Sequence, residues 1–153
     1  MKKKFILIFL VIFSLSSCGY SPIYYNTDIK NFKFNILKLI GDEEMNNIIN
    51  LEFKKISDEN AKNTLDLNIN TEYVRSILSK NKEGKATSYS LNNLIKFEVI
   101  NNKKSQMFIF NEEIKTENMN NEFELREYEK TLKNNFIKSK IKELILELSI
   151  ENK

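Results

Sequence analysis

Nine consecutive residues alternate between two kinds of side chain, and this run constrains the fold more than any other part of the chain. The two sets are the mainly apolar positions Leu65, Leu67, Ile69, Thr71 and Tyr73 and the polar positions Asp66, Asn68, Asn70 and Glu72. A period of two is that of a β-strand, in which successive side chains point to opposite faces. The run therefore predicts a half-buried strand with one face in water.

A strand pattern and a helix pattern precede this run. An alternation that begins at Phe32 predicts a strand, and Gly41 and Asp42 end it. Asp42 is a suitable N-cap, and the two glutamates that follow it suit the positive end of a helix dipole. Apolar residues then recur at helical spacing: Met45, Ile48, Ile49, Phe53 and Ile56. This spacing predicts an amphipathic helix over 43–57.

Two more strands are expected after the alternating run. A loop rich in Lys spans 80–85, and the next strand carries its apolar residues on one face: Tyr89, Leu91, Ile95, Phe97 and Val99. Residues 101–104 are a hairpin-turn candidate, and 107–114 is expected to form the third strand of a meander. Because 107–110 is apolar on both faces, we expect this segment to be covered on both sides or to contact a partner.

The chain closes with a long amphipathic helix over 122–150, capped by residues 118–121. Its apolar stripe consists of Leu125, Tyr128, Leu132, Phe136, Ile137, Ile141, Leu144, Ile145 and Leu148. The element order is therefore strand, helix, three strands and helix. A strand-helix-strand start requires a right-handed crossover, and the hairpins make the remaining pairs antiparallel. We expect a single α+β domain over 31–153, a two-layer sandwich with two helices packed on one face of a four-stranded mixed sheet.

The first residues have the pattern of a lipoprotein signal. A basic start precedes an apolar run over 5–13, which is short for a membrane span. Leu-Ser-Ser at 15–17 leads directly to Cys18, the single cysteine of the chain. We therefore expect a signal peptide over 1–17, fatty acids such as palmitate on Cys18 and a lipidated tether over 18–30. An N-terminal membrane anchor with an incidental cysteine is the alternative.

The composition argues against most enzyme classes. The chain has no histidine, which removes the usual general base and the commonest metal ligand. A single cysteine excludes disulfide frameworks and thiolate zinc sites within one chain. The excess of 24 Lys and Arg over 21 Asp and Glu belongs to the three lysines of the expected signal peptide. The mature domain would be nearly neutral, so we expect no catalytic residues, no cofactor, no metal and no nucleic-acid partner.

One basic cluster, defined as Arg75, Lys80, Lys82 and Lys85, surrounds the loop between the two longest strands. Lys supplies point charges and Arg supplies a planar fork, so the basic cluster is a candidate site for the phosphates of lipopolysaccharide head groups. An ordinary solvated hairpin end, with lysines for solubility, is the alternative. Arg126 lies among four glutamates of the final helix and is expected to form ion pairs with them.

Two short motifs resemble one protein family. Residues 18–24, Cys-Gly-Tyr-Ser-Pro-Ile-Tyr, resemble the C-G-[FY]-x-P-[LI]-Y opening of LptE-type lipopolysaccharide-assembly lipoproteins, particularly those of alphaproteobacteria. Residues 84–91, Gly-Lys-Ala-Thr-Ser-Tyr-Ser-Leu, resemble the G-x-A-T-R-Y-x-L entry into the central strand of that family. Ser88 stands where the family often has Arg, which removes one candidate head-group contact. The final helix resembles the closing helix of the family in length and stripe but lacks its usual alanines.

The resemblance implies both a fold and a function. LptE-type proteins have two helices on a four-stranded sheet, plug the LptD β-barrel of the outer membrane, help to assemble it and contact lipopolysaccharide. The chain is accordingly expected to be a non-enzymatic lipoprotein on the periplasmic side of the outer membrane, with an LptD-type barrel and lipopolysaccharide as partners. The alternatives are a lipid-anchored, periplasmic-facing subunit of another envelope assembly or secretion complex, and a lipid-binding lipoprotein with an apolar cavity.

Overall fold

The computed structural model describes residues 32–61, 63–101, 104–119 and 121–151. The predicted signal peptide over 1–17, the lipidation site at Cys18 and the tether over 18–30 lie outside the described residues. Within the described part, neither helix is both long and apolar enough to cross a membrane.

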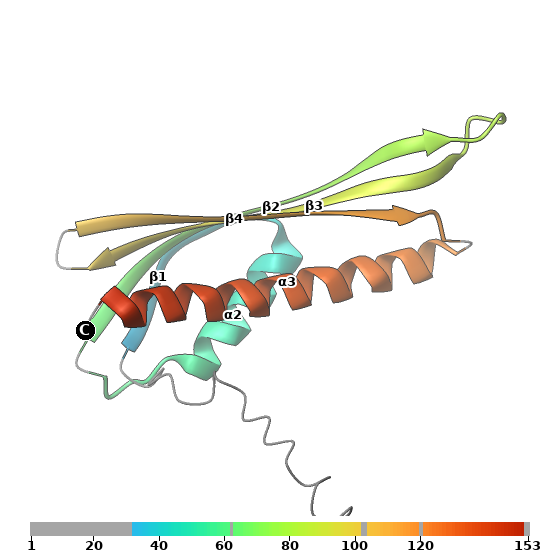
Figure 1. Ribbon diagram of the computed structural model, residues 1–153. Helices are drawn as coiled ribbons and strands as arrows, with labels where there is room; N and C mark the ends of the chain where they lie inside the picture. The colour runs from blue at the N-terminus through green and yellow to red at the C-terminus, as the bar shows by residue number, and fades with distance from the viewer. Residues whose placement is uncertain (1–31, 62, 102–103, 120, 152–153) are drawn as a thin grey trace, which may run out of the picture.

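The four strands form one sheet in the order β1-β2-β3-β4. β1 runs parallel to β2, and the β2–β3 and β3–β4 pairs are antiparallel. Both helices lie on the same side of the sheet (Figure 1), so the predicted two-layer α+β fold is confirmed. In chain order the elements are β1 (Phe32–Gly41), α2 (Glu43–Ile56), β2 (Asn63–Lys80), β3 (Ala86–Asn101), β4 (Lys104–Glu117) and α3 (Glu122–Glu151).

The core lies between the sheet and the two helices. A series of aromatic rings crosses it from β1 through α2 and β3 to β4: Phe34, Phe53, Phe97 and Phe110, with successive ring centroids 5.1, 6.2 and 6.0 Å apart. The apolar stripe of α3 completes the layer, with Phe136, Ile137 and Leu144 buried. Burial of these rings and aliphatic groups removes apolar surface from water, which is the main force that holds the two layers together.

The boundary between β1 and α2 matches the prediction. Asp42 is the N-cap of α2, and its Oδ1 accepts a hydrogen bond from the Met45 backbone N–H at 2.9 Å. Gly41 has a φ of 111°, a conformation that favours glycine because it has no Cβ. The chain therefore leaves the sheet sharply at this point and enters the helix layer.

The sheet has one covered face and one open face. On β4, Phe108 and Phe110 are buried against the helices, whereas Met107 and Ile109 on the other face are 56% and 60% exposed. We expected 107–110 to be covered on both sides or to contact a partner, and the structure covers one side. Contact of the open face with a partner stays a prediction.

Candidate functional site

The three lysines of the basic cluster lie at the tip of the β2–β3 hairpin. Asn81 builds this turn, because its Oδ1 accepts hydrogen bonds from the backbone N–H groups of Glu83 at 3.0 Å and Lys85 at 2.9 Å. Lys80, Lys82 and Lys85 are all exposed, and the Lys85 Nζ lies 3.3 Å from the Glu83 carboxylate. The turn therefore presents three ammonium groups to solvent at the far end of the sheet.

Arg75, the fourth member of the basic cluster, binds α3 instead of joining the tip. Its Nη1 lies 3.1 Å from Glu129 Oε1 and 3.4 Å from Glu122 Oε1, and its guanidinium lies 5.4 Å from the centre of the Tyr89 ring. The structure thus brings the three lysines together and separates Arg75 from them. The ion pairs that we expected between Arg126 and the glutamates of the final helix are not found among the described residues, and Glu122 and Glu129 pair with Arg75 instead.

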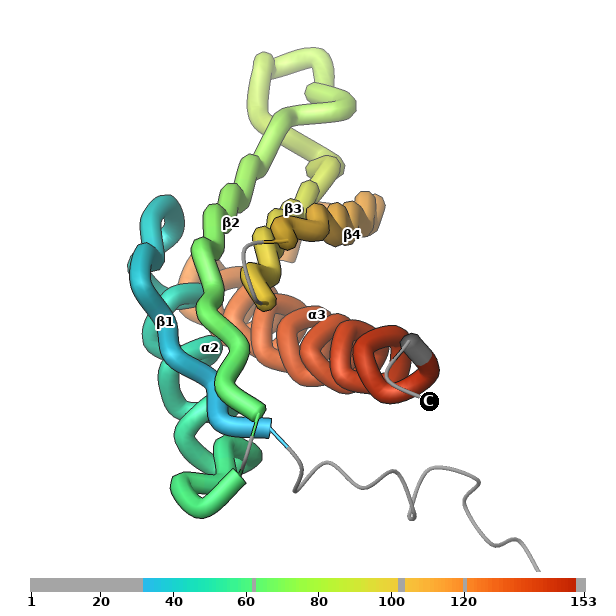
Figure 2. The backbone as a smooth tube through the Cα atoms, turned by 90° about the vertical axis from the view of Figure 1, so that its left-hand side faces the viewer, coloured from blue at the N-terminus to red at the C-terminus, as the bar shows by residue number. Residues whose placement is uncertain are grey.

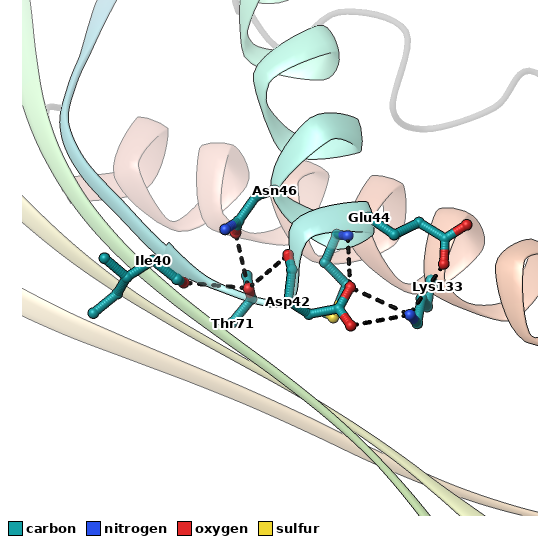
Figure 3. A network of polar contacts seen from close by, with 7 residues as sticks. Ile40, Asp42, Glu44, Asn46, Thr71 and Lys133 are labelled. Atoms are coloured by element: carbon teal, nitrogen blue, oxygen red, sulfur yellow. Dashed lines mark hydrogen bonds and ion pairs between the residues drawn. The ribbon is translucent and has the colours of Figure 1, made fainter.

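A buried ion pair that no local sequence pattern predicted joins the two helices. Lys133 of α3 is only 6% exposed, and its Nζ lies 3.1 Å from Asp42 Oδ2 and 3.0 Å from Glu44 Oε2 (Figure 3). The same Nζ lies 4.1 Å from the centre of the Tyr73 ring. The sequence carried one indication: Lys133 stands three and four residues before Phe136 and Ile137 of the apolar stripe, which places it on the buried side of the helix.

A second set of polar contacts fixes the place where β1 ends. The Asp42 N–H donates to the Thr71 carbonyl oxygen at 3.3 Å, and the Thr71 hydroxyl lies 2.8 Å from Asn46 Oδ1. The same hydroxyl lies 3.3 Å from the carbonyl oxygen of Ile40 (Figure 3). These contacts hold the last residues of β1, the middle of β2 and the start of α2 together.

Tyr73 provides a test of the buried layer. Its hydroxyl is buried with no hydrogen-bond partner of ordinary geometry among the described residues. Burial, and then the nearby Glu129 carboxylate, raises the pKa of Tyr73 far above its usual value.

We expect Tyr73→Phe to keep the free energy of unfolding at pH 7 within about 1 kcal/mol of the parent chain, because the hydroxyl that is removed makes no such bond. In the parent chain the raised pKa means that the folded state holds the Tyr73 proton more tightly than the unfolded state does. Stability should therefore fall as the pH rises above about 10, and Tyr73→Phe should weaken this fall. Urea titrations at pH 7 and pH 10.5 measure both effects, and a loss above 2 kcal/mol at pH 7 would contradict the assignment.

The open face of the sheet is rich in amides and balanced in charge. Its side chains include Asn68, Asn70, Asn92 and Asn111, which alternate with Lys, Glu and scattered apolar residues. Asn68 Nδ2 and Ser105 Oγ donate to Glu98 at 2.8 and 2.7 Å, and these hydrogen bonds lower the pKa of the Glu98 carboxyl. A shallow hollow of about 250 Å³ lies on this face, lined in part by Lys38, Ile40, Lys96 and Met107.

The described residues form no candidate metal centre. Within the described ranges, no group of three or more acidic or cysteine side chains is placed to hold a metal ion. The hollows on the open face and another of about 550 Å³ beside the start of α3 all lie outside the space between helices and sheet. The geometry therefore defines a two-layer α+β domain with a charged hairpin tip and an open, polar sheet face.

Solved structures of other proteins are similar to this fold. The crystal structure of rare lipoprotein B from Shewanella oneidensis matches 79% of this chain and 94% of its own chain, with a TM-score of 0.54 and 18% sequence identity. A lipoprotein candidate from Caulobacter crescentus matches 80% of this chain and 90% of its own, with a TM-score of 0.48 and 7% identity. No protein-family model and no curated protein matches the sequence. The chain thus shares its fold with rare lipoprotein B.

Proposed function

We propose that this protein is an outer-membrane lipoprotein of the LptE type, a non-enzymatic plug and assembly partner of an LptD-type barrel in lipopolysaccharide transport. The observation that carries the proposal is the fold. The resemblance of residues 18–24 and 84–91 to the LptE family implies two helices on a four-stranded sheet, and the chain has that architecture. Rare lipoprotein B shares the fold over 94% of its own chain, and this likeness also supports a lipid anchor on Cys18.

The proposed mechanism is occupancy of a barrel. The wide lumen of a large barrel is lined by polar groups and water, so a plug needs a polar surface with balanced charge. The open sheet face, which carries several asparagines and mixed Lys and Glu side chains, has this character. Met107 and Ile109 would contact apolar portions of the wall. Binding to the folded barrel alone would stabilise that barrel by mass action.

Guidance of lipopolysaccharide is the second part of the mechanism. Lys80, Lys82 and Lys85 are exposed at the hairpin tip, where ammonium groups can contact phosphates without first being freed from the core. Charge-assisted hydrogen bonds to phosphate are stronger than neutral ones. The tip therefore forms the lipopolysaccharide contact in this proposal, and Arg75 contributes by holding the hairpin to α3 through Glu122 and Glu129.

We expect the triple reversal Lys80→Glu, Lys82→Glu and Lys85→Glu to weaken lipopolysaccharide binding at least tenfold, which corresponds to about 1.4 kcal/mol or more. The loss follows from repulsion between carboxylates and phosphates at the tip. Binding of the full chain to immobilised lipopolysaccharide measures the effect, with circular dichroism to verify folding. The matched control reverses Lys104, Lys115 and Lys138, which are also exposed but lie elsewhere. Equal loss in both variants, or no loss in the first, would remove the tip from the mechanism.

Purification from native membranes tests the barrel partnership. A tagged full chain should co-purify with an LptD-type barrel, and mass spectrometry should find Cys18 acylated at the new N-terminus. Recovery with components of a different envelope assembly or secretion complex would favour the first alternative. An unprocessed signal peptide with a free Cys18 thiol would contradict the lipoprotein assignment.

A further inference from the structure

The sheet continues past the end of β1, and of the two helices only α3 follows it there. β1 pairs with β2 up to Thr71, whereas β2 continues to Lys80 with β3 beside it. Figure 2 shows β2 extending beyond β1, and Figure 1 shows α3 extending along the sheet past α2. We call residues 122–132 the front segment of α3. This segment lies on the three-stranded part of the sheet without support from the second helix.

A row of polar side chains crosses the sheet where the front segment ends. Tyr73 of β2 pairs with Asn93 of β3, and Asn93 pairs with Glu112 of β4, so the three side chains point to one face. This is the helix-facing side, because the Tyr73 ring lies 4.1 Å from the Lys133 ammonium of α3. Beyond the row, Leu91 is buried but does not belong to the main apolar cluster of the core. The main core therefore ends at this polar row.

Asn93 is fully buried and makes no side-chain hydrogen bond with any described residue. Its exposed fraction is 0%, and neither its Oδ1 nor its Nδ2 has a partner. The hydroxyl of Tyr73, its direct neighbour, is buried in the same way. A buried polar group without a hydrogen bond is less stable than the same group in water. Desolvation of the Asn93 amide thus opposes the packing of α3 on this row, and separation of the helix relieves it.

The contacts that hold the front segment are few and mostly polar. Leu125 is the only buried apolar residue of this segment, all of which the structure describes. The Arg75 side chain, which pairs with Glu122 and Glu129, is 36% exposed, and an ion pair open to water contributes little. The rest of α3 buries a longer apolar series: Phe136, Ile137, Ile141, Leu144, Ile145 and Leu148. Since apolar burial is the main source of local stability, the front segment is held less firmly than the rest of the helix.

We propose that the front segment of α3 opens from the sheet as a unit while the rest of the helix stays in place. The boundary lies at Lys133, whose buried Nζ is held by Asp42 and Glu44. Opening breaks the Arg75 ion pairs and lets water reach the amide of Asn93. The fold therefore contains a conformational device, in which one part of a helix exchanges an unpartnered buried amide for a hydrated one. This proposal does not rest on the barrel partnership.

Hydrogen exchange of the full chain, followed by mass spectrometry, measures the opening. We expect the amides of 126–132 to exchange at least about tenfold faster than those of 137–147, because they are released without unfolding of the main core. Low concentrations of urea should leave the faster rate nearly unchanged, since a local opening exposes little surface. The comparison omits 122–125, because the first N–H groups of any helix have no helical partner. Equal protection in the two ranges would overturn the proposal.

Asn93→Leu distinguishes this opening from ordinary fraying of a helix end. Leucine has the same branching and the same number of side-chain heavy atoms as asparagine, but no polar group to hydrate. We expect exchange of 126–132 to slow at least about threefold, because the variant removes the desolvation that favours opening. Asn93→Val, with a smaller side chain, should act in the same direction if leucine overpacks the site.

Asn92→Leu is the matched control for these variants. Asn92 is the chain neighbour of Asn93 and lies on the open face of the sheet, so its replacement should leave exchange of 126–132 unchanged. Unchanged or faster exchange in both Asn93 variants would mean that water does not reach position 93 when the helix end opens. That result would contradict the proposal.

Ile141→Val tests whether the two parts of α3 open separately. Ile141 is 4% exposed, and loss of one buried methylene group weakens the packing of the second part of the helix. We expect exchange of 137–147 to become severalfold faster, with no change in 126–132. Equal acceleration in both ranges would show that α3 opens as one helix and would reject a separate front segment.

Discussion

Gly41→Ala is expected to be the most damaging single substitution in the described part of the chain. A Cβ at position 41 would lie 1.8 Å from the Thr71 carbonyl oxygen and 2.7 Å from its carbonyl carbon. Both atoms belong to the backbone of β2, which β3 holds on its other side, so neither can move away cheaply. The φ of 111° adds strain for any residue with a side chain. We expect a loss of at least about 4 kcal/mol, a large part of the stability of a domain this size.

Gly84→Ala is the matched control for this prediction. Gly84 also has a positive φ, 80°, but a Cβ there would meet no atom within 4 Å. The backbone strain alone costs about 1–2 kcal/mol. Urea unfolding followed by circular dichroism should therefore separate the two variants by several kcal/mol. Similar stabilities of the two variants would show that Gly41 lies farther from the Thr71 backbone than the structure describes.

Asp42→Ala is expected to cost nearly as much. The substitution removes the N-cap of α2, a loss of about 1 kcal/mol, and leaves the Lys133 ammonium buried with Glu44 as its one remaining carboxylate partner. Breaking a buried ion pair outright costs about 3–5 kcal/mol, because the remaining charge stays out of water. Glu44 stays within 3.0 Å of the Lys133 ammonium, so we expect the charge contribution at the lower end of this range. Thermal or urea unfolding at pH 7 measures the sum.

Two variants separate the contributions of the cap and the charge. Asp42→Asn keeps a side-chain oxygen for the Met45 N–H but removes the negative charge, so the cap contribution survives. Lys133→Met removes the buried charge and leaves Asp42 and Glu44 at 22% and 41% side-chain exposure, where water can solvate them. We expect Lys133→Met to be less harmful than Asp42→Ala. The reverse order would mean that the ammonium group is solvated in the folded state.

Local patterns determined the elements and their order. The alternation from Leu65 to Tyr73 predicted β2, and the spacing of Met45, Ile49 and Phe53 predicted the buried side of α2, because each pattern follows from the geometry of a single element. Asp42 was predictable as an N-cap, since a cap depends on residues within one turn. The Arg75 contact to α3 was not predictable, because its partners lie 47 and 54 residues along the chain.

The sequence by itself therefore determined the two-layer fold, the positions of its strands and helices and the lysines of the hairpin loop, since periodicity and capping are local properties. The tertiary structure decided that Lys133 enters a buried ion pair, that Arg75 leaves the tip for α3 and that β2 extends beyond β1. Each of these depends on how elements that are far apart in the sequence pack together and on where one strand ends beside another. Such contacts are set by the packing of whole elements, which no single stretch of residues encodes.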